Sequence, residues 1–156
     1  MAKKVLFVCI HNSARSQMAE ELLRKYGGDE FEVQSAGFEP SELNPLVIEV
    51  LKEEGIDISG KGTNSVFNLF KAGKTFNYVI TVCDEGNAQK CPVFPGLSYR
   101  IHWSFEDPRS FSGSHEEKLA KTKIVKEQIK KEILTLIEHV KSGDLKDNCP
   151  NSWTIN

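Results

Sequence analysis

The chain has 156 residues, of which 39% are hydrophobic and 27% charged, and its formal net charge is -2. This length suits one domain with a core of its own. The near-neutral charge excludes a broad basic surface for nucleic acid or an anionic membrane. The apolar run within residues 1–10 is too short for a signal peptide, and no run reaches the ~18 residues of a membrane span. We therefore expect a cytoplasmic protein with neither a nucleic-acid nor a membrane partner.

Hydrophobic periodicity predicts strands and helices that alternate along the chain. Short aliphatic runs indicate buried strands, and apolar positions three and four residues apart indicate helices. Asn44 before Pro45, and Ser114 before Glu117, are helix-start signals. The predicted elements are strand 3–10, helix 13–26, strand 31–37, helix 45–55, helix 64–73, strand 76–82, strand 98–103 and helix 114–140.

This order predicts an α/β fold with a four-stranded parallel sheet and helices on both faces. We place the domain at residues 1–143 and a C-terminal tail without periodicity at 144–156. Ligands of such sheets bind at the carboxyl ends of the strands. Cys9 and Cys83 each follow a predicted strand and are therefore expected at that edge.

The chain has four cysteines, at positions 9, 83, 91 and 149. In a cytoplasmic protein, cysteines serve reactivity or metal binding more often than a disulfide framework. Because none of the four forms a C-x2-C pair of the zinc type, we expect no metal site.

The loop between the first strand and the first helix has the features of an oxyanion site. Its backbone N–H groups and the helix dipole favour negative charge, and the guanidinium of Arg15 can hold two oxygens of a tetrahedral anion. The same surroundings favour the thiolate of Cys9. The alternative is a buried cysteine at a strand end and an arginine on a helix surface. The predicted oxyanion-binding residues are Ile10, His11, Asn12, Ser13, Ala14, Arg15 and Ser16.

Four side chains of this loop are expected to have specific roles or orientations. Asn12 tolerates a left-handed backbone, which a tight loop often needs. Ser13 and Ser16 offer hydroxyl groups to the thiolate or to the loop itself. His11 is expected to point outward rather than to take part in catalysis.

The segment "VCIHNSARSQMAEELL" (8–23) resembles the catalytic loop of the low-molecular-weight protein tyrosine phosphatases, most closely their thioredoxin-coupled arsenate reductase branch. The similarity continues through "EEGIDIS" (53–59), "VITVCDE" (79–85) and "HWSFEDP" (102–108), and it covers roughly residues 3–140. The resemblance implies arsenate reduction in arsenic detoxification, with Cys9 as nucleophile, Arg15 as oxyanion clamp and Asp107 as general acid. Without it, Asp107 before Pro108 reads as a turn residue.

A second reachable thiol distinguishes the two activities of this group. Phosphate ester hydrolysis needs only Cys9, Arg15 and Asp107. Arsenate reduction takes two electrons, which two thiols supply when they form a disulfide. With the resemblance, Cys83 and Cys91 become the second and third thiols of a relay; without it, Cys83 could be only a small apolar residue. An anion-binding or redox-sensing module without turnover is a third alternative.

The resemblance also implies partners. Thioredoxin is the expected external reductant, although glutaredoxin or a small thiol would serve the same chemistry, and no bound cofactor is expected. Arg109 and Ser110 replace the tyrosine pair of the phosphatases, which argues against a large aromatic substrate.

Two features of the sequence bear on accessory sites. Some relatives bind potassium beside the loop; Asn12 and Ser35 match that pattern, but residues 60–65 contain no carboxylate, so no potassium site is assigned. Cys149 has no counterpart and is expected to be a surface thiol, with an accessory redox role as the alternative.

Overall fold

The computed structural model describes residues 2–83, 98–142 and 154–155. Two 3-10 turns lie at Gly28–Glu30 and Pro108–Ser110. The strands and helices are β1 (Lys3–Cys9), α1 (Arg15–Gly27), β2 (Phe31–Gly37), α2 (Pro45–Lys52), α3 (Val66–Lys71), β3 (Tyr78–Thr81), β4 (Tyr99–His102), α5 (His115–Ser142) and β5 (Thr154–Ile155).

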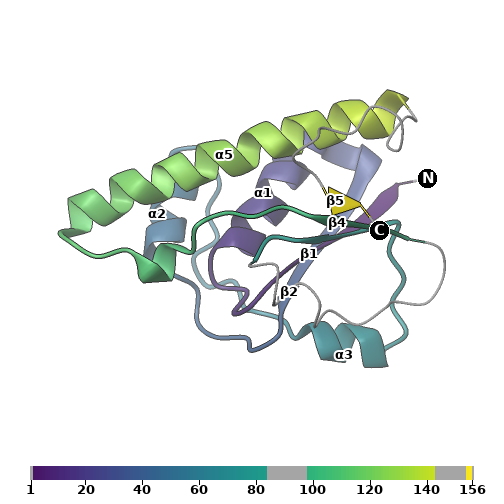
Figure 1. The fold of residues 1–156 in the computed structure, drawn as a ribbon, viewed down its shortest axis with the longest axis horizontal. Helices are drawn as coiled ribbons and strands as arrows, with labels where there is room; N and C mark the ends of the chain where they lie inside the picture. Colours follow the sequence, from purple (N-terminus) through teal and green to yellow (C-terminus); the bar gives the residue numbers. More distant parts are fainter. Residues whose placement is uncertain (1, 84–97, 143–153, 156) are drawn as a thin grey trace.

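The strands form one sheet in the order β2-β1-β3-β4-β5 (Figure 1). The first four are parallel, which confirms the predicted four-stranded parallel sheet. The short β5 pairs antiparallel with β4 and was not predicted, because two residues show no periodicity. It belongs to the region predicted as a tail, of which only 154–155 are described; the domain boundary at 143 stays a prediction.

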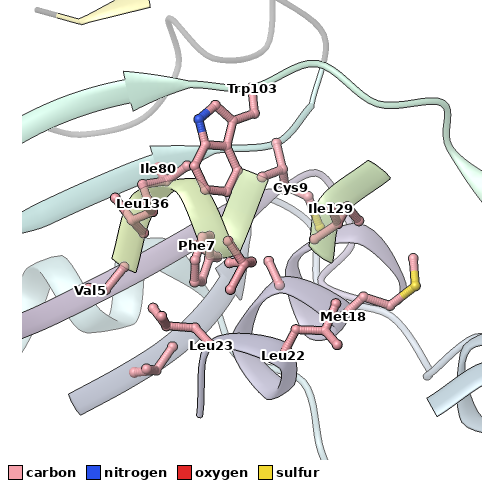
Figure 2. Close-up of a cluster of buried hydrophobic side chains, with 14 of the residues drawn as sticks. Val5, Phe7, Cys9, Met18, Leu22, Leu23, Ile80, Trp103, Ile129 and Leu136 are labelled. Atoms are coloured by element: carbon pink, nitrogen blue, oxygen red, sulfur yellow. The ribbon is translucent and has the colours of Figure 1, made fainter. Parts of the chain in front are cut away.

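Helices cover both faces of the sheet, as predicted (Figure 1). On one face, α1 and α5 pack against the larger buried cluster, which includes Phe7, Met18 and Ile129 (Figure 2). On the other face, Val66 at the start of α3 packs against Leu6 and its neighbours. Burying the sheet on both sides explains why its central strands are continuous apolar runs.

Side-chain caps set the starts of two helices as predicted. The Asn44 side chain accepts a hydrogen bond from Leu46 N at 3.0 Å, and Ser114 Oγ accepts one from Glu117 N at 3.1 Å. The α1 helix begins at Arg15 rather than Ser13. Residues 10–14, between β1 and α1, form the predicted oxyanion-binding loop, called the anion loop below. None of the helices in the described ranges is long and apolar enough to span a bilayer.

Candidate functional site

The candidate site lies where two loops leave adjacent parallel strands. β1 is followed by the predicted anion loop and β3 by Cys83, and Val82 N donates to Val8 O at 2.8 Å just beyond the β1–β3 ladder. Chain order reverses between these two strands, and ligands of open α/β sheets bind at such switch points. Cys9 and Cys83 are both buried and share one apolar cluster (Cys9 in Figure 2). Cys91 and Cys149 lie outside the described residues.

The Cys9 sulfur is surrounded by hydrogen-bonding groups of its own loop. Asn12 N donates to Cys9 Sγ at 3.1 Å, and Ser16 Oγ lies 2.9 Å from the same sulfur. Both contacts stabilise a thiolate, because a charged acceptor strengthens the hydrogen bonds it receives. The Ser16 hydroxyl therefore lies within hydrogen-bond distance of the sulfur, and its role toward a thiolate stays a prediction.

Loop carbonyls face outward and are held by the segment that follows β2. Ile10 O, His11 O and Ser13 O accept from the backbone N–H groups of three residues in 39–44, at 2.7, 3.0 and 3.0 Å. Since the C=O and N–H of a trans peptide point in opposite directions, the N–H groups of His11, Asn12 and Ala14 face the other side. The Asn12 N–H bond to Cys9 Sγ lies on that inner side. The geometry is that of the predicted oxyanion cradle.

Asn12 makes the hydrogen bonds that hold the shape of the anion loop. It has φ 53°, the predicted left-handed backbone, and its side chain is fully buried. Its Nδ2 donates to Ser16 Oγ at 2.8 Å and to Ser35 Oγ at 2.9 Å. Its Oδ1 accepts from Asn64 N at 2.9 Å. These bonds hold a conformation that is unfavourable for a non-glycine residue.

Arg15 projects from the first turn of α1 toward the segment after β4. Only 3% of the Arg15 side chain is exposed, so the alternative of a surface arginine is wrong. Its Nη1 donates to Phe105 O at 3.1 Å, and its Nη2 lies 3.4 Å from Asp107 Oδ2. Asp107 also caps a 3-10 turn by accepting from Arg109 N at 3.0 Å. The fold thus brings Asp107, the predicted general acid, next to Arg15, the residue predicted to hold the oxyanion.

Residues 4–145 match the family model for low molecular weight phosphotyrosine protein phosphatases. The chain belongs to this family. It is 43% identical over 141 residues to an arsenate reductase of Halalkalibacterium halodurans, covering 88% of this chain and 98% of the relative. It is 40% identical over 127 residues to an arsenate reductase of Bacillus subtilis, covering 81% and 89%.

Solved structures of the family agree with this assignment. An arsenate reductase in the oxidized state has a TM-score of 0.70 at 31% identity, with 88% of this chain and 98% of that chain covered. A thioredoxin-dependent arsenate reductase of Corynebacterium glutamicum has a TM-score of 0.66 at 31% identity, covering 91% and 63%. A tyrosine phosphatase of Erwinia amylovora, at 16% identity and TM-score 0.70 with 88% and 93% covered, shares the fold.

A pocket beside the loop is lined by both polar and apolar residues. The pocket is shallow and opens between Ser13 and the exposed Arg109. Its lining consists of Ser13, Ser41, Glu42, Leu43, Asn44, Pro45 and Arg109. None of these described lining residues is aromatic.

The sequence analysis did not predict a charged cluster beside the anion loop, formed by Glu20, Glu21, Arg24 and Lys61. Glu20 is 4% exposed, its Oε1 is hydrogen-bonded to Ser35 Oγ, and its Oε2 pairs with Arg24 at 2.6 Å and Lys61 at 2.9 Å. Burial lowers the pKa of Arg24, but hydrogen bonds and charge attraction from Glu20 and Glu21 together outweigh it and leave the pKa above its ordinary value. The four-residue spacing from Ser16 to Glu20 was the available signal, since it places a carboxylate on the same helix face.

These residues do not fit a potassium ion. Asn12 Nδ2 already donates to Ser35 Oγ, and Asn12 Oδ1 already accepts from a backbone N–H. The positive charge beside Glu20 comes from Arg24 and Lys61. Groups of three or more His, Cys, Asp or Glu that could hold a metal ion do not occur within the described ranges.

Proposed function

We propose that this enzyme reduces arsenate to arsenite with electrons from thioredoxin, in arsenic detoxification. The observation that carries the proposal is the second buried thiol, Cys83, at the strand next to the one that ends in Cys9. A phosphatase has no use for that thiol, whereas a two-electron reduction requires one. Relatives about 40% identical bear the name arsenate reductase.

In the first step, the Cys9 thiolate attacks the arsenic of arsenate. Arg15 and the inner N–H groups of the loop hold the oxygens, where charge develops. Asp107, 3.4 Å from the guanidinium, donates a proton to the departing oxygen, which leaves as water. An S–As bond forms and an As–O bond breaks, so arsenic stays pentavalent in the adduct.

In the second step, the Cys83 thiolate attacks the sulfur of Cys9. The S–S bond forms while the S–As bond breaks, and its electron pair stays on arsenic, which leaves as arsenite. Two thiols are oxidised to one disulfide and arsenic gains two electrons, so the step balances. The burial of both cysteines in one cluster supports their meeting.

In the third step, the Cys91 thiolate attacks the sulfur of Cys83 and releases the Cys9 thiolate. The resulting Cys83–Cys91 disulfide is the proposed substrate of thioredoxin, which reduces it by exchange through a mixed disulfide. Glutaredoxin or a small thiol could perform the same exchange. We propose a cytoplasmic location, where such reductants are kept reduced, and no resident cofactor.

The test is arsenite formation over many turnovers with NADPH, thioredoxin reductase and thioredoxin. We expect sustained turnover by the wild type and none by Cys83→Ser. Cys91→Ser should stop after about one equivalent of arsenite. Cys149→Ser, outside the relay, is the matched control and should turn over normally.

Three results would contradict the proposal. Multiple turnovers by Cys83→Ser would remove that thiol from the mechanism. No arsenite from the wild type, together with steady hydrolysis of an aryl phosphate, would favour a phosphatase that uses Cys9, Arg15 and Asp107. Turnover of neither substrate would favour a sensing module.

A further inference from the structure

The ammonium of Lys61 joins two carboxylates of α1. Lys61 Nζ lies 2.9 Å from Glu20 Oε2 and 2.8 Å from Glu21 Oε1. The Lys61 side chain is 25% exposed, whereas the Glu20 side chain is only 5% exposed. An ion pair with a buried partner is less screened by solvent than one on the surface. The electrostatic attraction between Lys61 and Glu20 is therefore stronger than that of an ordinary lysine pair on the surface.

Glu20 is connected to the anion loop by a continuous set of hydrogen bonds. Its Oε1 is bonded to Ser35 Oγ, and Ser35 Oγ accepts from Asn12 Nδ2 at 2.9 Å. The same Asn12 Nδ2 donates to Ser16 Oγ, which lies 2.9 Å from Cys9 Sγ. A change in the position of the Glu20 carboxylate is thus transmitted to the residue whose left-handed backbone shapes the loop.

Lys61 is tied to the loop by its own segment as well. In residues 60–65, Asn64 N donates to Asn12 Oδ1 at 2.9 Å and Asn64 Nδ2 donates to Ser35 O at 3.1 Å. Gln17 Nε2 donates to Gly62 O at 3.4 Å. The ion pairs of Lys61 hold this segment on α1, so the amide of Asn12 is fixed from both its donor and its acceptor side.

The charges of the cluster balance only when Lys61 is present. Glu20 and Glu21 carry two negative charges, and Arg24 and Lys61 carry two positive charges. Removing Lys61 leaves one net negative charge behind a loop whose task is to bind an anion. Such a charge opposes oxyanion binding, and it also leaves a buried carboxylate less well paired.

We propose that Lys61 is a positioning residue for the oxyanion site. Its ammonium acts as a built-in counter-ion that holds Glu20 against Ser35, and through Ser35 it holds the Asn12 amide that shapes the loop around Cys9. The proposal concerns oxyanion binding, which arsenate reduction and phosphate hydrolysis both need. It therefore stands apart from the outcome of the thiol relay.

The test measures the affinity of the site for inorganic phosphate. Phosphate at increasing concentration protects Cys9 from iodoacetamide, and alkylation at Cys9 is followed by peptide mass spectrometry in the full chain. We expect Lys61→Met to weaken phosphate binding on the order of tenfold, as for residues coupled to a site without touching the ligand. This readout requires no arsenate turnover.

Two control variants separate positioning from general stability. Lys61→Arg keeps the charge and should bind phosphate within about twofold of the wild type. Glu21→Gln removes the second partner of Lys61, but Glu21 pairs with the same two cations without being bonded to Ser35. It should also bind phosphate within about twofold, although, like Lys61→Met, it removes two ion pairs at α1.

The outcomes are distinct. If Lys61→Met binds phosphate like the wild type, Lys61 has no positioning role. If Glu21→Gln weakens phosphate binding as much as Lys61→Met, the effect is one of helix stability and the proposal is overturned. Thermal unfolding of each variant, measured alongside, identifies any loss that follows from misfolding.

Discussion

The Arg15 guanidinium and the Asp107 carboxylate lie 3.4 Å apart, between the first turn of α1 and the segment after β4. The carboxylate therefore shares its cation with any oxyanion that enters the loop. The two negative groups repel each other, but a protonated Asp107 can donate to the anion instead. This contact brings Asp107, the proposed acid, to Arg15, the residue that we propose holds the oxyanion.

Asp107→Asn separates these two effects. We expect single-turnover arsenite formation to slow on the order of 100-fold, because the leaving oxygen loses its proton donor. Phosphate binding should instead tighten by roughly threefold, because a carboxylate beside Arg15 is removed. The exposed neighbour Glu106 is the matched control, as Glu106→Gln should change neither quantity. Slower reduction with weaker phosphate binding would indicate a distorted loop rather than a lost acid.

Ser16→Ala tests the contact between the hydroxyl and the sulfur of Cys9. Loss of the hydroxyl removes the 2.9 Å contact to Cys9 Sγ, leaves the contact from Asn12 N, and removes an acceptor for Asn12 Nδ2. Hydrogen bonds to charged groups contribute ~1.5 kcal/mol or more, so iodoacetamide alkylation of Cys9 at neutral pH should slow by about tenfold. The exposed Ser104 gives the control, and equal rates for Ser16→Ala and Ser104→Ala would contradict the prediction.

Gly37→Ala tests how closely β2 approaches the anion loop. A Cβ at this position would lie 2.7 Å from Asn12 N and 2.7 Å from Ile10 O, and backbone atoms cannot move aside as a side chain does. We expect urea unfolding to show a loss of about 1–3 kcal/mol, with weaker phosphate binding. At Gly62 an added Cβ meets nothing within 4 Å, so Gly62→Ala is the control and should stay within about 0.5 kcal/mol. Equal stability of the two variants would rule out the close approach.

Glu54 ties α1 to α5 and makes stability depend on pH. Its carboxylate accepts from Tyr26 Oη at 2.7 Å and pairs with Lys25, Lys126 and Lys130. The Tyr26 hydrogen bond lowers the pKa of Glu54 most, burial opposes this, and the lysines lower it further, from the ordinary 4.5 to about 2. A lowered pKa stabilises the fold above the unfolded-state value, and this contribution is lost as the pH falls.

Glu54→Gln should therefore lower the free energy of urea unfolding by about 1–3 kcal/mol at neutral pH. The difference from the wild type should shrink as the pH falls from 4.5 toward 2. Glu53→Gln serves as control, because its pair with Lys123 at 2.8 Å is about half exposed on both sides and surface pairs contribute little. A difference between Glu54→Gln and wild type that is constant with pH would contradict the assigned pKa.

The charged cluster also predicts the response to monovalent cations. Because Lys61 and Arg24 already neutralise Glu20 and Glu21, replacing NaCl by KCl at equal ionic strength should leave phosphate protection of Cys9 unchanged. Tighter protection in potassium would show that an ion takes part in shaping the loop, against the role proposed for Lys61.

Much of the fold followed from local patterns. The bounds of β2 were predicted to the residue, and the caps at Asn44 and Ser114 were located correctly, because periodicity and capping depend on residues a few positions apart. The start of α1 was placed two residues early, since helical spacing does not register the left-handed turn at Asn12. β5 was too short to leave a pattern.

For the site, the sequence by itself determined the loop from Cys9 to Arg15, because one strand end and one helix start carry all of its groups. Only the tertiary structure decided which distant residues complete it. Asp107 reaches Arg15 because β4 lies beside β3 in the sheet, and Asn64 reaches Asn12 because its segment crosses the end of β2. The same segment carries Lys61, whose ammonium pairs with Glu20 of α1. Such contacts depend on strand order and chain crossing, which no local spacing encodes.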